Sequence, residues 1–194
     1  MLPFTNHSYY EDHTFQAEEI QTAPQIKCAE FCDCAFVDCK FPGISFFDCI
    51  FEGCSFDNCD LTSISIKHTS FRDVLFTETK LTGIHWPDAA LPLDVKFKQS
   101  ILNYSNFIGV DLRSVDLVHC QLKEVDFTET NLTKADCRYS DFSGARFVKT
   151  NLSYTNLTHA TGYSIHPAGN TLRKTRFSFP EAVSLLDNLD IILE

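Results

Sequence analysis

Cysteine and histidine are the residues of this chain that could bind a metal ion or form disulfide bonds. The sequence contains nine cysteines and seven histidines, without a C-x-x-C pair and without zinc spacing among the histidines. The cysteines recur instead at intervals of five or its multiples, as in Cys34, Cys39, Cys49, Cys54 and Cys59. Cysteine in a reducing compartment behaves as a small hydrophobic residue. The spacing therefore predicts a structural role inside the fold and no metal.

Motifs of the common enzyme classes do not occur either. The sequence lacks G-x-S-x-G, a phosphate-binding P-loop and G-x-G-x-x-G, and it has only seven glycines. We therefore expect a protein that is not an enzyme and needs no cofactor.

The net charge and the first residues of the sequence narrow the range of possible functions further. With 16 basic and 26 acidic residues, the formal net charge is −10. Nucleic-acid affinity depends on many Lys and Arg contacts, so we expect no direct nucleic-acid binding. The first residues lack the basic region and apolar run of a signal peptide. No stretch approaches the roughly 18 apolar residues of a membrane span. These features predict a cytoplasmic protein with no membrane contact.

A large apolar residue at every fifth position is the dominant pattern. A helix gives no stripe at this spacing, and a flat strand alternates its faces, so neither element explains it. A chain that turns a corner every five residues does, with four sides forming a coil of about 20 residues and coils about 4.8 Å apart. One register holds Ile26, Phe31, Phe36, Phe41, Phe46, Phe51, Phe56, Leu61, Ile66, Phe71, Phe76, Leu81 and Trp86; the second runs from Phe97 to Leu157 in steps of five.

The residue two places before the large one is small in most repeats, while Ile44, Ile64 and Ile84, spaced 20 apart, form a ladder of their own. Cys34, Cys54, Val74 and Thr79 are examples of the small residues. This position should also point inward, and it must be small because the large side chain fills the axis. The double pattern predicts a four-sided solenoid.

Short motifs of the second register carry a family resemblance. Ala135-Asp136-Cys137, Thr150-Asn151-Leu152 and Thr155-Asn156-Leu157 resemble the repeat of the pentapeptide-repeat family, in which a small residue and Asn or Asp precede Leu or Phe. The resemblance covers about residues 26–160. It implies an all-β fold, a right-handed quadrilateral β-helix.

The chain divides into three predicted parts. Residues 1–25 form an N-terminal segment or cap, residues 26–160 the β-helix with a register break at 87–96, and residues 161–194 a C-terminal cap and dimerisation helix. Ser178 and Glu181 fit a capping box and Pro180 suits a first turn, so a short C-terminal α-helix is expected there.

Two longer stretches narrow the resemblance. They are "TSFRDVLFTETKLTGIHW" (69–86) and "RFSFPEAVSLLDNLDI" (176–191). Both resemble the topoisomerase-protecting branch of the family, which contains the albicidin-resistance protein and the Qnr-type quinolone-resistance proteins. The resemblance implies a homodimer formed through the C-terminus. The candidate dimer residues are Leu185, Leu186, Leu189, Ile191 and Ile192.

Residues 20 apart should stack in columns, and two neighbouring columns carry acidic groups. Such columns could imitate duplex DNA, which carries one negative charge per roughly 1.7 Å. Short polar side chains also support tight turns, so corner chemistry is the alternative explanation. The candidate topoisomerase-binding residues are Asp33, Asp38, Asp73 and Glu78 on the columns, and Trp86, Pro87 and Asp88 at the register break.

Together, the columns and the resemblance predict a DNA-mimicking protein that interacts with DNA gyrase. It would protect this enzyme from topoisomerase poisons such as albicidin or fluoroquinolones. The sequence leaves topoisomerase IV open as a second target, and it does not identify the drug. The alternative is a structural or adaptor solenoid with another protein partner.

Overall fold

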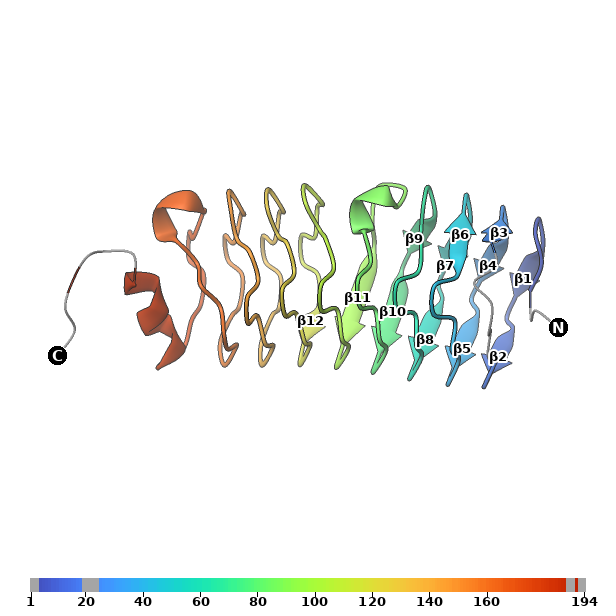
Figure 1. Cartoon of the computed structure of the whole chain (residues 1–194), viewed down its shortest axis with the longest axis horizontal. Coiled ribbons are helices and arrows are strands. Elements are labelled where there is room, and N and C mark those ends of the chain that lie inside the picture. The colour runs from blue at the N-terminus through green and yellow to red at the C-terminus, as the bar shows by residue number, and fades with distance from the viewer. Residues whose placement is uncertain (1–3, 19–24, 188–190, 192–194) are drawn as a thin grey trace.

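Residues about twenty positions apart lie side by side throughout the chain, which is the predicted stacking of coils. In the computed structural model, which describes residues 4–18, 25–187 and 191, Phe31 pairs in parallel with Phe51 and Phe51 with Phe71. The coils form a straight stack with the two termini at opposite ends (Figure 1). The protein is therefore a right-handed, four-sided β-helix, as predicted.

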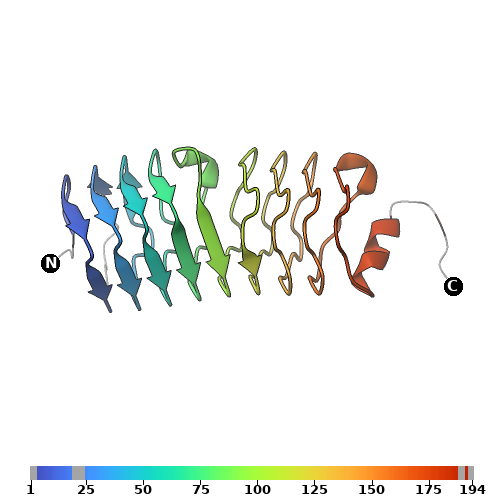
Figure 2. The same cartoon turned by 180° about the vertical axis from the view of Figure 1, so that it is seen from behind.

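Short parallel strands form the sides of the coils. They are β1 (Tyr9–Glu11), β2 (Thr14–Gln16), β3 (Gln25–Lys27), β4 (Glu30–Cys32), β5 (Ala35–Val37), β6 (Ser45–Phe47), β7 (Ile50–Glu52), β8 (Ser55–Asp57), β9 (Ser70–Arg72), β10 (Val74–Thr77), β11 (Val95–Lys98) and β12 (Leu117–Val118). Three sheets have the orders β1-β4-β7-β9, β12-β11-β10-β8-β5-β2 and β3-β6. Beyond β12 the sides pair through isolated bridges such as Asn131↔Asn151, and the view from behind shows this change from arrows to loops (Figure 2).

Stacked aromatic rings fill the axis of the N-terminal half. The rings of Phe31 and Phe51 lie 4.8 Å apart and those of Phe36 and Phe56 4.4 Å apart, with interplanar angles of 4° in both pairs. Each buried side chain of this size contributes roughly 1.5–3 kcal/mol of burial. The repeated Phe and Leu positions thus supply the stability that the short strands lack.

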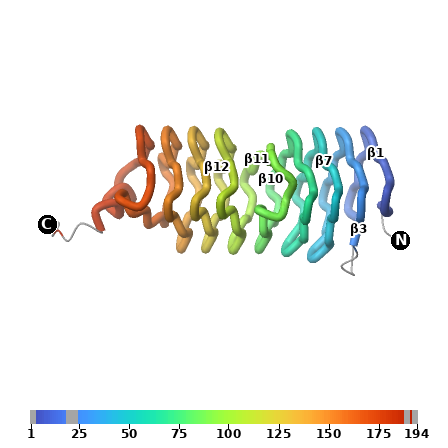
Figure 3. Tube along the Cα trace, turned by 90° about the horizontal axis from the view of Figure 1, so that it is seen from above, coloured from blue at the N-terminus to red at the C-terminus, as the bar shows by residue number. Residues whose placement is uncertain are grey.

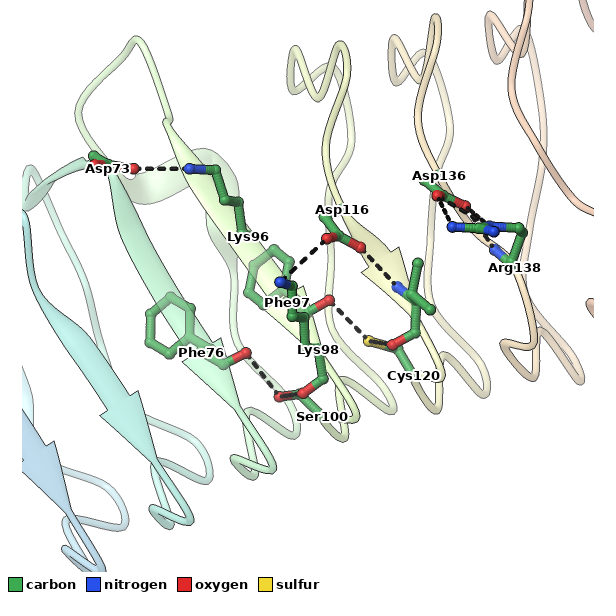
Figure 4. A network of polar contacts seen from close by, with 11 residues as sticks. Asp73, Phe76, Lys96, Phe97, Lys98, Ser100, Asp116, Cys120, Asp136 and Arg138 are labelled. Carbon is green, nitrogen blue, oxygen red and sulfur yellow. Dashed lines mark hydrogen bonds and ion pairs between the residues drawn. The ribbon is translucent and has the colours of Figure 1, made fainter.

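The small inward residues also donate hydrogen bonds. Cys54 Sγ donates to the carbonyl oxygen of Phe31 at 3.2 Å, and Thr79 Oγ1 donates to that of Phe56, also at 3.2 Å. Ser100 and Cys120 repeat the arrangement with Phe76 and Phe97 (Figure 4). A buried carbonyl without a partner costs about 1–3 kcal/mol. Cys, Thr and Ser at this position therefore add a hydrogen bond to their packing, whereas Val74 fills the same position by size alone.

The parallel pairing begins before the predicted start of the repeats. Tyr10 in β1 pairs with Phe31, within the segment predicted as an N-terminal cap. Phe4 closes this end, since its ring packs edge-to-face against Phe15, Phe31 and Phe41. The offset from Tyr10 to Phe31 is one residue longer than the usual 20, which hides the first coil from a count in fives.

The pairing also continues into the predicted C-terminal cap. Asn156 bridges to Arg176, and Leu172 and Phe177 pack against the core in the register of Leu157. Between Leu157 and Leu172, the run of large apolar residues is interrupted by a segment that contains the 3-10 helix η2 (Pro167–Gly169). The last coil therefore keeps the 20-residue offset and extends the β-helix beyond residue 160, where the predicted repeats end.

The C-terminal helix differs from its prediction. It is a 3-10 helix, η3 (Glu181–Leu186), rather than an α-helix. Its N-cap is Pro180, and no side-chain capping bond forms. The Ser178 hydroxyl instead accepts the backbone N–H of His159 at 2.7 Å, so it is not available for the predicted capping box. A 3-10 helix is typical of such a short element.

Candidate protein-binding surface

The backbone adopts a positive φ at nearly every corner of the β-helix. Asp33, Asp38, Asp73 and Glu78 all occupy such corners, with φ between 48° and 55°. Their side chains are exposed. Asp tolerates the left-handed region better than most residues because its short side chain can bond locally. The four acidic candidates are thus presented outward by the turns themselves.

Asp33, Gly53 and Asp73 form the first predicted column. A Cβ atom at Gly53 would collide with Asp33 Oδ1, so the Asp33 carboxylate leans over the next coil. Asp73 accepts an ion-paired hydrogen bond from Lys96 Nζ at 2.8 Å (Figure 4). This bond raises the pKa of Lys96. The column therefore has one unpaired carboxylate, Asp33, and one that is already compensated.

Asp38, Asn58 and Glu78 form the second column. Asn58 Nδ2 donates to Asp38 Oδ1 at 2.7 Å, which fixes the carboxylate on the edge. A groove of about 200 Å³ lies beside it, and Glu78, Asp60, Lys40 and Lys80 also line it. The structure thus brings Asp38 and Glu78 together on one groove, while Asp33 and Asp73 lie on the neighbouring corner.

Acidic residues of the C-terminal half are mostly paired with cations. Asp136 forms an ion pair with Arg138 at 2.7 Å, and Asp111 forms one with Arg113 at 2.8 Å. Both carboxylates also accept the backbone N–H two residues further on, which is turn chemistry. Of the two corner carboxylates of this half, Glu129 pairs with Lys149, whereas Glu124 makes no ion pair with a described residue, so unpaired corner charge is concentrated in the N-terminal half.

The same edge carries stacked rings further along. His119, Tyr139 and His159 continue the column of Asp38, and their rings stack at 4.7 Å and 4.9 Å. A DNA-like charge column therefore does not extend over the whole rod. This ladder was not predicted, although the 20-residue spacing of the three residues is visible in the sequence.

The prediction that Trp86 belongs to the binding surface is wrong. The side chain of this residue is 0% exposed. The indole stacks on Phe107 at 5.4 Å and contacts Phe76 and Phe97 edge-on. The apolar axis accommodates the largest side chain of the chain more favourably than water does. Trp86 thus belongs to the core.

The rest of the register break lies on the surface. The 3-10 helix η1 (Trp86–Asp88) exposes Asp88, which pairs with His85 at 3.2 Å, and half-buries Pro87. Leu91 is 69% exposed and, with Pro92, Leu93, Asp111 and Arg113, lines an open cavity of about 550 Å³. The extra residue is absorbed here, because β10 and β11 pair with an offset of 21.

Apolar side chains gather at the C-terminal end. Leu185 packs against the core, whereas Leu186 and Ile191 are 36% and 52% exposed. Phe179, which the sequence analysis did not select, is 84% exposed. Leu189 and Ile192 lie outside the described residues. The dimer interface stays a prediction.

Comparison with known proteins identifies the family. The model of the pentapeptide repeat region matches residues 29–107 and 92–157, which is more than half of the chain. The chain belongs to the pentapeptide-repeat family. No curated protein sequence matches it.

Solved structures share the pentapeptide-repeat fold. One trypsin-treated variant of QnrB1, a plasmid-mediated fluoroquinolone resistance protein, has a TM-score of 0.58 and 19% identity, covering 98% of this chain and 99% of that one. A second trypsin-treated QnrB1 variant has a TM-score of 0.57 and 20% identity, covering 96% and 99%. At this identity the likeness shows the fold.

Two observations concern metal binding and thiol reactivity in the described part of this pentapeptide-repeat protein. There, His, Cys, Asp and Glu side chains do not gather in a group of three or more that could hold a metal ion. Burial raises the pKa of the Cys54 and Cys120 thiols to about 12, which disfavours the reactive thiolate. The described helices include none long and apolar enough to cross a membrane.

Proposed function

We propose that this pentapeptide-repeat protein is a DNA-mimicking binding protein that occupies the DNA-binding saddle of a type II topoisomerase, chiefly DNA gyrase. Its action is to protect the enzyme from a DNA-cleavage poison such as albicidin or a fluoroquinolone. It does so by competing with DNA or by destabilising the drug-trapped cleavage complex, without catalysis of its own. The fold shared with the fluoroquinolone resistance protein QnrB1 supports this assignment.

The observation that carries the proposal is a set of exposed carboxylates on two neighbouring corners of the N-terminal half, Asp33, Asp38 and Glu78, called the acidic edge below. Asp33, Asp38 and Glu78 project from left-handed corners of a narrow, straight rod, and none of them makes an ion pair with another described residue. The rod is seen from above in Figure 3. Complementary charge steers association and makes it sensitive to salt. We therefore expect binding to weaken steeply as the salt concentration rises.

A gyrase supercoiling assay tests the proposal. The protein is titrated with and without albicidin or a fluoroquinolone. Supercoiling restored at protein concentrations that barely inhibit the drug-free enzyme is the expected result. If the protein inhibits gyrase but does not restore supercoiling in the presence of drug, the result would agree with DNA mimicry and contradict protection. If neither activity appears for the folded protein, the adaptor role with another partner takes its place.

Paired variants test the acidic edge. D38N/E78Q removes two charges from the groove while Asn still tolerates the corner at position 38. We expect this variant to need about tenfold more protein for the same rescue. The matched control, E30Q/E124Q, removes two exposed carboxylates elsewhere and should behave like the unaltered protein. An equal loss of rescue in both variants would mean that the total net charge, rather than the position of Asp38 and Glu78, determines the binding.

A further inference from the structure

Exposed cations gather on the last coils of this acidic protein. Arg173, Lys174 and Arg176 lie on the coil that pairs with residues 151–156, and Lys134 lies two coils before Lys174 in the same column. None of these four forms an ion pair with another described residue, whereas Lys96, Arg138 and Lys149 do. Their charge is therefore free to meet a partner.

Tyr154 organises two of these cations. Arg173 Cζ lies 5.8 Å and Lys174 Nζ 5.7 Å from the centre of its ring. Cations within about 6 Å of a ring face are attracted to it by roughly 0.5–1 kcal/mol at exposed sites. The ring thus holds two flexible side chains on the surface before any partner arrives. Lys134, Tyr154, Arg173, Lys174 and Arg176 are called the cationic edge below.

The surroundings of the cationic edge leave its charge uncompensated. Asn151, Ser153 and Asn156 are its neutral neighbours one coil back. The nearest carboxylate on these columns is Asp136, and Arg138 already binds it through both Nε and Nη2. The edge is therefore a positive area on a chain whose net charge is −10.

We propose that the cationic edge is a docking site for a short acidic segment of a partner protein. The planar guanidinium groups of Arg173 and Arg176 can each receive a carboxylate through two parallel hydrogen bonds. Lys134 and Lys174 add point charges on either side of Tyr154. This site is separate from the proposed topoisomerase contact, which uses side chains of the opposite charge.

Its size favours an acidic peptide over duplex DNA. Lys134 and Lys174 are two coils apart, about 10 Å at the usual strand spacing. A duplex continues its charge well beyond that length. Laid along this edge, it would meet the carboxylates of Asp94 and Asp33, because Lys134 and Lys174 continue their column. A segment with a few carboxylates ends before it reaches them.

Fluorescence anisotropy of the purified protein tests the site. The probe is a fluorescein-labelled peptide of eight glutamates, compared with a labelled DNA duplex, at about 50 mM and about 200 mM salt. We expect the peptide to bind, more weakly at the higher salt, and R173E/K174E to lower the affinity at least about tenfold. Y154A should cost about threefold, because the two cations lose their shared ring.

The control is K27E/K67E, which reverses two exposed lysines of the N-terminal half that make no ion pair with a described residue. It should change the affinity less than about twofold. An equal loss in both double variants, or no peptide binding at all, would overturn the proposal. Tighter binding of the duplex, lost in R173E/K174E, would assign the edge to nucleic acid instead. Circular dichroism and urea midpoints verify that each variant is folded. Because topoisomerase is absent from this assay, its failure would leave the proposed function standing.

Discussion

At the residue scale, one corner geometry explains much of the surface. Asp33, Asp38, Asp73 and Glu78 adopt positive φ values, as do residues at almost all other corners. Non-glycine residues pay about 1–2 kcal/mol for this region, and short polar side chains reduce that cost. The same residues therefore serve the turn and supply the charge. Asn at these positions separates the two roles, because it keeps the turn and removes the charge.

Buried thiols give the protein a stability that depends on alkaline pH. Burial raises the pKa of Cys54 and Cys120 to about 12, whereas an unfolded thiol ionises near 8.5. Between these values the unfolded chain binds fewer protons than the native one, so stability falls as the pH rises. The contribution is fully present below about pH 8.5 and is lost progressively towards pH 12.

Urea midpoints measured from pH 8 to pH 11 check this prediction. C54S/C120S keeps hydroxyl donors for the carbonyls of Phe31 and Phe97 but has no thiol to ionise. Its midpoint should fall less steeply with pH than that of the unaltered protein. C28S, which changes an exposed cysteine, should show the original slope. Parallel slopes in all three proteins would contradict the role of burial.

At the element scale, the register break serves both the core and the surface. η1 places the Trp86 side chain in the axis and passes the chain to the exposed Leu91. Replacing Trp86 by Ala should lower the free energy of unfolding by about 3–5 kcal/mol, because a buried stack against Phe107 is lost. Chemical denaturation followed by far-ultraviolet circular dichroism measures this change.

The matched control for W86A is L91A, which truncates an exposed side chain of the same break. It should alter the unfolding free energy by no more than about 0.5 kcal/mol. W86F should fall between the two, since it retains an aromatic ring in the stack. A W86A protein as stable as L91A would mean that the break, rather than the indole, sets the local stability.

At the scale of the whole molecule, we predict that two rods join through the C-terminal end. Phe179, Leu186 and Ile191 are exposed in this part of the chain, while Leu185 packs on the core. If this end joins two rods, L186D/I191D should convert a dimer into a 22.0 kDa monomer in light scattering. The reason is that two carboxylates would be buried without partners.

V148D provides the comparison, because Val148 is an exposed apolar residue on the side of the rod. It should remain dimeric. A mass that is the same for L186D/I191D and V148D would refute the terminal interface. These substitutions leave Leu185 unchanged, so the core contact of η3 is preserved.

The sequence alone determined the β-helix, because the axis of each coil imposes one large and one small inward residue every five positions. Ile26 to Trp86 and Phe97 to Leu157 satisfied that rule, and the one-residue shift between them was readable. The first coil was not, since Tyr10 pairs with an offset of 21, and neither was the last, since Gly162 and Pro167 stand where the register has large apolar residues. A local repeat cannot report a pairing that skips residues.

Only the tertiary structure decided which side chains reach the surface and which charges remain free. Trp86 fits the inward register but also stands at the irregular turn, where it was predicted to bind, and packing against Phe107 decided between the two roles. Asp73 and Asp38 look alike in sequence, yet Lys96 compensates the first, whereas Asn58 holds the second as a free carboxylate. Arg173 and Lys174 meet over Tyr154 only after the coils stack. These outcomes depend on contacts between residues about twenty positions apart, which no short motif encodes.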